Sequence, residues 1–191
     1  HIMFDGRKHV SLGSFSAAQD RTISVYSLSK TYAMSGLRLG YVIINQPVFL
    51  ERMKKLVRCT INGVNSVAQY GAAAAINGSQ EFTHSMTFEY QKRRDILWDA
   101  LQGAPYVEPF KPSGAFYLWA RIKPDWPGYD GRQDDWSMTN YLIDSAGIGS
   151  SPGSAFGAAG AGHIRFAFSC STAQVEEAAK LLPGTLQAAK K

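Results

Sequence analysis

Hydrophobic and polar positions along the chain follow two periods, one typical of strands and one typical of helices. Ile23 and Val25 alternate with polar neighbours, which predicts a half-buried strand. The apolar run 40–44 predicts a strand covered on both faces. Together these patterns predict strands at 22–26, 40–44, 114–121 and 163–168. Because helical segments separate the strands, the expected fold class is α/β.

Helical periodicity occupies most of the remaining chain. It predicts helices at 47–57, 64–76, 79–102 and 136–146, and a last helix that begins at residue 171. Segment 64–76 is apolar almost all round and is expected to be buried. Ser171 and Gln174 have the spacing of a capping box. Segment 123–135, rich in Pro, Gly and Asp, is expected to be a surface loop.

Composition narrows the class of protein. The 191 residues are 45% hydrophobic and 18% charged, which indicates a folded chain and excludes a disordered one. No apolar run approaches the roughly 20 residues that span a bilayer, so we expect no membrane partner. The net charge of +5 is scattered along the chain, which argues against nucleic-acid binding. Two cysteines without paired spacing predict no metal site, and cytoplasmic localisation is the expectation.

Candidate chemistry is concentrated in the connection between the first two strands. Ser27, Ser29 and Arg38 supply hydroxyls and a guanidinium, the groups that bind a phosphate monoester. Lys30, placed at a strand end beside such a site, can form a Schiff base with a carbonyl compound. Gly36 and Gly40 are expected to turn the backbone so that Arg38 folds back towards Ser27. The alternative is a solvated turn with an ordinary surface lysine.

Two other motifs compete with this interpretation. Ser27-Leu28-Ser29-Lys30 satisfies the S-x-x-K pattern of penicillin-binding enzymes, but the accompanying S-D-N and K-T-G motifs do not occur. The serine of that pattern should also open a helix, whereas the nearby glycines favour a loop. The glycines of 157–162 lack the spacing of a dinucleotide-binding loop and precede a strand, so they predict a turning loop.

The motif Ser27-x-Ser29-Lys30, followed by Arg38 and Gly40, resembles the cofactor-lysine signature of class I/II aminotransferases, pyridoxal-phosphate enzymes of fold type I. Three later motifs agree in order: Pro112-Ser-Gly114-Ala-Phe116-Tyr117, Pro152-Gly153-Ser-Ala-Phe156-Gly157 and His163-Ile-Arg165-Phe166-Ala-Phe168-Ser169. The resemblance implies the C-terminal half of such an enzyme. Residues 1–80 would be the end of the large mixed-sheet cofactor domain and 81–191 the small α/β domain, joined by the long helix.

The resemblance also implies residue roles. Lys30 resembles the lysine that forms a Schiff base with pyridoxal 5'-phosphate and later moves a proton. Ser27 and Arg38 resemble the phosphate-binding side chains, with Ser29 a weaker candidate. Arg165 resembles the arginine that binds the substrate α-carboxylate, and strand alternation places it opposite the apolar face of its strand. Without the resemblance, a structural salt bridge would be the expectation for Arg165.

The implied function is transfer of an amino group between an amino acid and a 2-oxo acid, of aspartate or aromatic type, by a homodimer. Two alternatives stay open: a C–S or other β-lyase of the same fold, and the effector domain of an aminotransferase-like transcription regulator. Because the family's other cofactor-binding residues precede this region, we expect the chain alone to bind the cofactor weakly without turnover. Phe116, Tyr117 and Trp119 fit either an apolar pocket or core packing.

Overall fold

The computed structural model describes residues 1–129 and 134–189, which form two compact units. Unit 1 comprises His1 and Arg7–Met86, and unit 2 comprises Ile2–Gly6 and Thr87–Lys191. The division falls within the long helix α4 (Glu81–Leu101). The assignment of domains to 1–80 and 81–191 stays a prediction. Among the described residues, no helix is long and apolar enough to cross a membrane.

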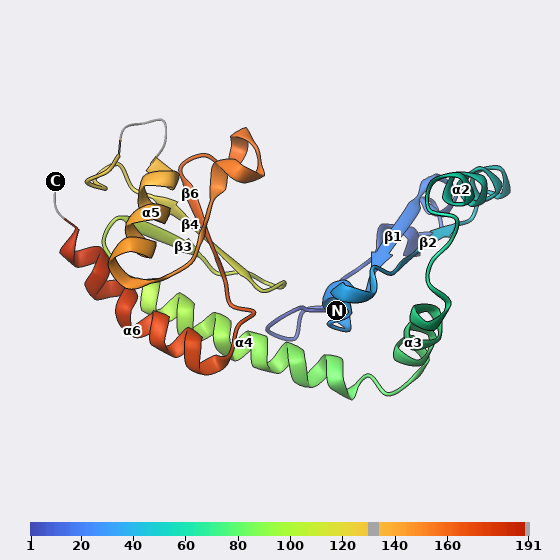
Figure 1. Cartoon of the computed structure of the whole chain (residues 1–191), viewed down its shortest axis with the longest axis horizontal. Helices are drawn as coiled ribbons and strands as arrows, with labels where there is room; N and C mark the ends of the chain where they lie inside the picture. Colours follow the sequence, from blue (N-terminus) through green and yellow to red (C-terminus); the bar gives the residue numbers. More distant parts are fainter. Residues whose placement is uncertain (130–133, 190–191) are drawn as a thin grey trace. The chain divides into compact units, whose positions relative to one another are not determined.

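Unit 1 is built on an antiparallel pair of strands in which Ser27 lies opposite Gly40. Its elements are β1 (Ile23–Ser27), α1 (Leu28–Thr31), β2 (Gly40–Ile44), α2 (Pro47–Thr60) and α3 (Ser66–Asn77), with 3-10 turns at Leu12–Ser14, Gln19–Arg21 and Ser35–Leu37. Both predicted strands and both predicted helices are confirmed, with ends shifted by up to three residues. Figure 1 shows these elements in colours from blue (β1) to green (α3).

The predicted burial in unit 1 is wrong. Four of the five residues of β2 are exposed, and α3 buries only Ala68 and Ala72 while its Tyr70 is 81% exposed. The physical reason is that β2 pairs with β1 alone in the described part of the chain, so only a small core forms. That core consists of Leu28, Leu39, Ala68 and Ala72.

Unit 2 contains a four-stranded antiparallel sheet in the order β3-β4-β6-β5. The strands are β3 (Val107–Phe110), β4 (Tyr117–Ile122), β5 (Ser151–Pro152) and β6 (His163–Ala167), and the helices are α4, α5 (Asp134–Ala146) and α6 (Thr172–Ala188). The two predicted strands and three predicted helices are confirmed, as is the capping box between Ser171 and Gln174. The prediction missed β3 and β5. The predicted loop 123–135 ends early because Asp134 and Asp135 begin α5, and its residues 130–133 lie outside the described part.

One face of this sheet and three helices form the main core. Leu118 and Ala120 of β4 and Ile164 and Phe166 of β6 point to this face, where all four are buried. The helices α4, α5 and α6 contribute Leu97, Leu101, Met138, Leu142, Val175, Leu182 and Leu186 to the same cluster. The opposite face of the sheet is therefore left for polar and ligand-binding side chains.

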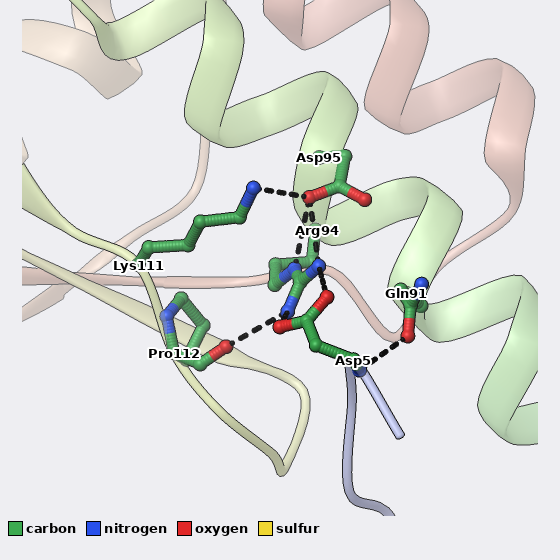
Figure 2. Close-up of polar contacts among 6 residues, drawn as sticks. All are labelled: Asp5, Gln91, Arg94, Asp95, Lys111 and Pro112. Atoms are coloured by element: carbon green, nitrogen blue, oxygen red, sulfur yellow. Dashed lines mark hydrogen bonds and ion pairs between the residues drawn. The ribbon is translucent and has the colours of Figure 1, made fainter. Parts of the chain in front are cut away.

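The segment Ile2–Gly6 packs within unit 2 and is held there by a buried arginine (Figure 2). Arg94 of α4 is 1% exposed and donates from Nη1 and Nη2 to the two carboxylate oxygens of Asp5, at 2.7 and 2.8 Å. It also donates to Asp95 and to the Pro112 carbonyl, at 3.0 and 3.2 Å. The hydrogen bonds to Asp5 raise the pKa of the Arg94 guanidinium. The N-terminal segment is thus fixed to α4 by a charged, hydrogen-bonded anchor.

Candidate functional site

Lys30 lies in a single helical turn immediately after β1. The Ser27 hydroxyl accepts a hydrogen bond from the Ser29 backbone N–H at 3.2 Å and so caps α1. Lys30 occupies the third position of this turn and is exposed. The predicted loop therefore contains a short helix, and the argument that Ser27 should not open one was wrong. The case against an S-x-x-K enzyme rests on the missing S-D-N and K-T-G motifs alone.

Backbone pairing holds the segment closed at the strand ends. The Leu28 N–H donates to the Leu39 carbonyl at 3.2 Å, and both side chains lie in the small core of unit 1. A Cβ added to Gly40 would collide with the Tyr26 carbonyl oxygen, so glycine is required for β2 to start this close to β1. This closure places Ser27 and Arg38 at the same end of the two-stranded sheet.

The prediction that Arg38 folds back towards Ser27 stays a prediction, and one nitrogen of its guanidinium is bound to Ser35. The Arg38 Nη1 donates to the Ser35 carbonyl at 2.9 Å, and the Arg38 backbone adopts the left-handed conformation with φ 54°. Gly36 is not in the left-handed region; Ala33 and Arg38 take the positive φ values in this segment. The expected contribution of Gly36 to the turn is therefore wrong. Arg38 borders a hollow of about 910 Å³ that also involves the loop before α3.

The donors at this strand end fit a phosphate monoester. Ser27 and Ser29 carry hydroxyls, and the Arg38 guanidinium keeps Nε and Nη2 for a further acceptor. Phosphate oxygens are acceptors, so this donor set is complementary to them. The exposed amine of Lys30 belongs to the same turn as two of these groups. The residues present therefore fit a cofactor that carries a phosphate and a carbonyl group.

Arg165 lies on the outward face of β6 in unit 2, and the predicted alternation is confirmed. Ile164 and Phe166 are buried on the opposite face. The guanidinium is stacked between two rings: its Cζ lies 4.3 Å from the Tyr117 ring centroid and 4.2 Å from that of Phe156. Arg165 is thus held in a defined orientation by β4 and by the 3-10 turn Gly153–Phe156.

The hydrogen bonding of Arg165 is incomplete. Nη2 donates to the Ser151 hydroxyl at 3.2 Å, while the buried Nε finds no partner among the described residues. No acidic side chain in the described part of the chain forms an ion pair with it. The structural salt bridge expected in the absence of a family resemblance is therefore not observed there. A half-buried guanidinium without a counter-charge is the arrangement that an anionic ligand completes.

Three aromatic residues left open by the sequence have different environments. Phe116 is in the core, Tyr117 stacks on Arg165, and Trp119 lines a hollow on the outward face. The sequence analysis did not predict the contact of Phe156 with Arg165. Phe156 ends the 3-10 turn Gly153–Phe156, between Pro152-Gly153 and Gly157, and strand alternation does not apply to such a turn.

Comparisons with known proteins agree with this geometry. Residues 1–182 match the model of the family "Aminotransferase class I and II", whose members depend on pyridoxal phosphate. The chain is 34% identical to an aspartate aminotransferase of Pyrococcus abyssi and 33% identical to aromatic-amino-acid aminotransferase 2 of Thermococcus litoralis, in each case over 93% of this chain and 44% of the relative.

Among solved structures, an aromatic aminotransferase from Pyrococcus horikoshii OT3 superposes with a TM-score of 0.86 at 30% identity. The match covers 97% of this chain and 48% of that protein. The chain spans somewhat less than half the length of these relatives. Since the family model covers nearly all of its residues, the fold is that of fold-type I aminotransferases. This chain belongs to the class I and II aminotransferase family.

Proposed function

We propose that this chain supplies the lysine and the carboxylate-binding arginine of a pyridoxal-phosphate-dependent aminotransferase, which transfers an amino group between an amino acid and a 2-oxo acid. The observation that carries the proposal is Arg165, a half-buried guanidinium that is oriented by two rings and lacks an acidic partner among the described residues. An amino acid and a 2-oxo acid share one group, the α-carboxylate, that such an arginine binds.

In this proposal, Ser27, Ser29 and Arg38 would hold the cofactor phosphate, and the Lys30 amine would condense with its aldehyde carbon, with water as the leaving group. When bound, pyridoxal phosphate supplies an electron-withdrawing ring that accepts the electron pair left when the substrate Cα loses a proton. Once the substrate amino group has displaced it from that carbon, Lys30 would be a free amine that accepts the Cα proton and donates it to the cofactor carbon that carried the aldehyde. Lys30 lies in a one-turn helix that is capped by the Ser27 hydroxyl. The position of the lysine backbone is therefore fixed relative to the hydroxyl that we propose binds the phosphate.

Arg165 orients the substrate. Nη1 and the second hydrogen of Nη2 are available for an end-on, two-point contact with a carboxylate, because Ser151 uses only one Nη2 hydrogen. The stacked rings of Tyr117 and Phe156 restrict rotation of the guanidinium. A carboxylate bound in this way fixes the direction of the neighbouring Cα–H bond.

Reductive labelling tests the cofactor site with the chain itself. The protein is incubated with pyridoxal phosphate, reduced with borohydride and digested, and the label on each lysine is quantified by mass spectrometry. We expect preferential labelling of Lys30 over Lys55, an exposed lysine of α2 that serves as an internal control. Arg38→Gln should lower labelling of Lys30 about tenfold, as loss of a charge-assisted hydrogen bond implies, and leave Lys55 unchanged. Equal labelling of both lysines in the unaltered protein would reject the site.

The remaining parts of the proposal rest on the family alone. We propose a homodimer in the cytoplasm, and turnover that requires family regions beyond these 191 residues. The chain mixed with pyridoxal phosphate, phenylalanine or aspartate, and 2-oxoglutarate should therefore form no glutamate. Sustained glutamate formation would contradict this, and release of pyruvate and ammonia from a cysteine conjugate would favour the lyase alternative.

A further inference from the structure

A row of four residues crosses the outward face of the sheet in unit 2. Phe110 of β3 lies opposite Trp119 of β4, which lies opposite Arg165 of β6, which lies opposite Ser151 of β5. Paired residues of antiparallel strands point to the same face. An apolar pair and a guanidinium are therefore direct neighbours on this surface, with the Ser151 hydroxyl at the far end.

Four rings border a shallow, solvent-open hollow at the apolar end of this row. We term these four residues the aromatic box: Phe110, Trp119, Phe156 and His163. The Trp119 ring meets Phe156 edge-on at 5.6 Å and His163 edge-on at 6.0 Å, and Phe110 lies 6.2 Å from His163. The hollow has a volume of about 360 Å³ and is completed by Ala159 and Gly160. Phe110 and Phe156 are 49% and 51% exposed, so much of their ring surface is open to a ligand.

Phe156 joins the box to Arg165. The Phe156 ring contacts the Trp119 ring, and the Arg165 Cζ lies 4.2 Å from the centroid of the Phe156 ring. A molecule with a carboxylate on Arg165 and a ring in the box therefore needs only a short linker between the two groups. No lysine or arginine lines the hollow among the described residues, and Arg121, opposite His163 on the same face, is already ion-paired with Glu108. A second carboxylate placed in the hollow would therefore lose its hydration without gaining an unpaired counter-charge.

We propose that the aromatic box selects an amino acid with an aromatic side chain, whose α-carboxylate is bound by Arg165. This inference rests on the proposed function and names its substrate class. Overall similarity does not decide the class, because relatives named for aspartate and for aromatic amino acids are equally close, at 34% and 33% identity. The chemistry of the outward face does, since Arg165, which has no acidic partner among the described residues, lies beside an apolar hollow, while Arg121 on that face is ion-paired with Glu108.

Binding of amine-free analogues tests the box without cofactor or turnover. The indole N–H signals of the four tryptophans are followed by NMR at pH 8, above the range in which histidine side chains are usually charged, and Trp119→Phe assigns the signal of Trp119. The ligands are 3-phenylpropionate, 3-phenylpropanol and succinate. We expect 3-phenylpropionate to shift the Trp119 signal with a millimolar Kd, and each of the other two to bind at least fivefold more weakly.

Variants separate the two halves of the contact. Phe110→Ala should weaken 3-phenylpropionate about two- to tenfold, as loss of one aromatic contact implies. Arg165→Gln should weaken it about tenfold or more and leave 3-phenylpropanol unchanged. Phe88→Ala, which removes a 70% exposed ring on α4, away from the box, is the matched control. It should leave the binding of both ligands unchanged.

Three outcomes overturn the inference: no shift of Trp119 with 3-phenylpropionate, equal binding of succinate, or binding of 3-phenylpropionate that Arg165→Gln leaves intact. Labelling of Lys30 is measured independently in unit 1. If any of these three outcomes is found while Lys30 is labelled preferentially, only the proposed substrate class is rejected. Equal labelling of Lys30 and Lys55 rejects the cofactor site itself.

Discussion

Replacement of Asp5 by asparagine probes the anchor that fixes the N-terminal segment to α4. Asn keeps the shape of the side chain and tolerates the left-handed backbone that Asp5 adopts, with φ 57°, whereas Ala at this position would add strain. The substitution replaces one carboxylate oxygen, which accepts a hydrogen bond from buried Arg94, by an NH2 group. That group is itself a donor and cannot accept from the guanidinium. Hydrogen bonds to charged groups contribute about 1.5–3 kcal/mol, and the 47% exposure of Asp5 places the loss near the lower end, about 1.5 kcal/mol.

Urea unfolding followed by tryptophan fluorescence measures this loss in unit 2 alone, because all four tryptophans lie there: Trp98, Trp119, Trp126 and Trp136. With an m-value of about 1.2 kcal/mol/M, the midpoint should fall by about 1 M. Asp99→Asn, an exposed aspartate on the same helix, is the control and should move the midpoint by less than about 0.3 M. Equal shifts in the two variants, or an undiminished effect of Asp5→Asn in an Arg94→Met background, would refute the reasoning.

Two further predictions concern a helix cap and a tyrosine. Ser171→Ala removes the hydrogen bonds of the Ser171 hydroxyl with Gln174 and keeps the one from the Ser171 backbone N–H to the Gln174 side chain. It should cost about 1 kcal/mol in the same fluorescence assay, while Ser169→Ala, just outside the helix, should have little effect. Burial, with smaller contributions from Tyr26 and Tyr32, raises the pKa of the Tyr41 phenol above its ordinary value of 10.0. Above that pH the folded state keeps a proton that the unfolded state loses, so the stability of unit 1 should fall as pH rises. Circular dichroism should detect a smaller fall in Tyr41→Phe, and an identical pH dependence would contradict the assignment.

Local patterns predicted the elements well and their burial poorly. The bounds of β2 and the start of α2 at Pro47 follow from a short β-branched run and from proline at the first helical turn. Burial depends on what else packs against an element, and that information is not local. The apolar run of β2 is suited to a strand covered on both faces, yet four of its five residues are exposed in the described part of the chain.

The candidate site also shows that local sequence patterns do not reveal contacts between residues far apart in the chain. Lys30, Ser27 and Arg165 are found by motif and alternation because each signal lies within a few consecutive residues. Ser151, which accepts from Arg165, and Phe110 of the aromatic box come from β5 and β3, the two strands that the sequence analysis missed. Both contain a proline, Pro109 and Pro152, and proline argues against a strand unless the strand lies at a sheet edge.

Both strands do lie at the edges of the sheet, where a proline is tolerated. Pro109 and Pro152 are therefore compatible with these strands, although each argued against a strand in the sequence. Edge position also has a functional consequence. An edge strand places Phe110 and Ser151 at the rim of the outward face, where a side chain is reachable from solvent and still aligned by its partner strand. The same feature therefore accounts for the failure of the sequence prediction and for the accessibility of the aromatic box. Substitutions at these two rim positions should alter ligand preference with little loss of stability, which the Phe110→Ala titration and its fluorescence unfolding curve test together.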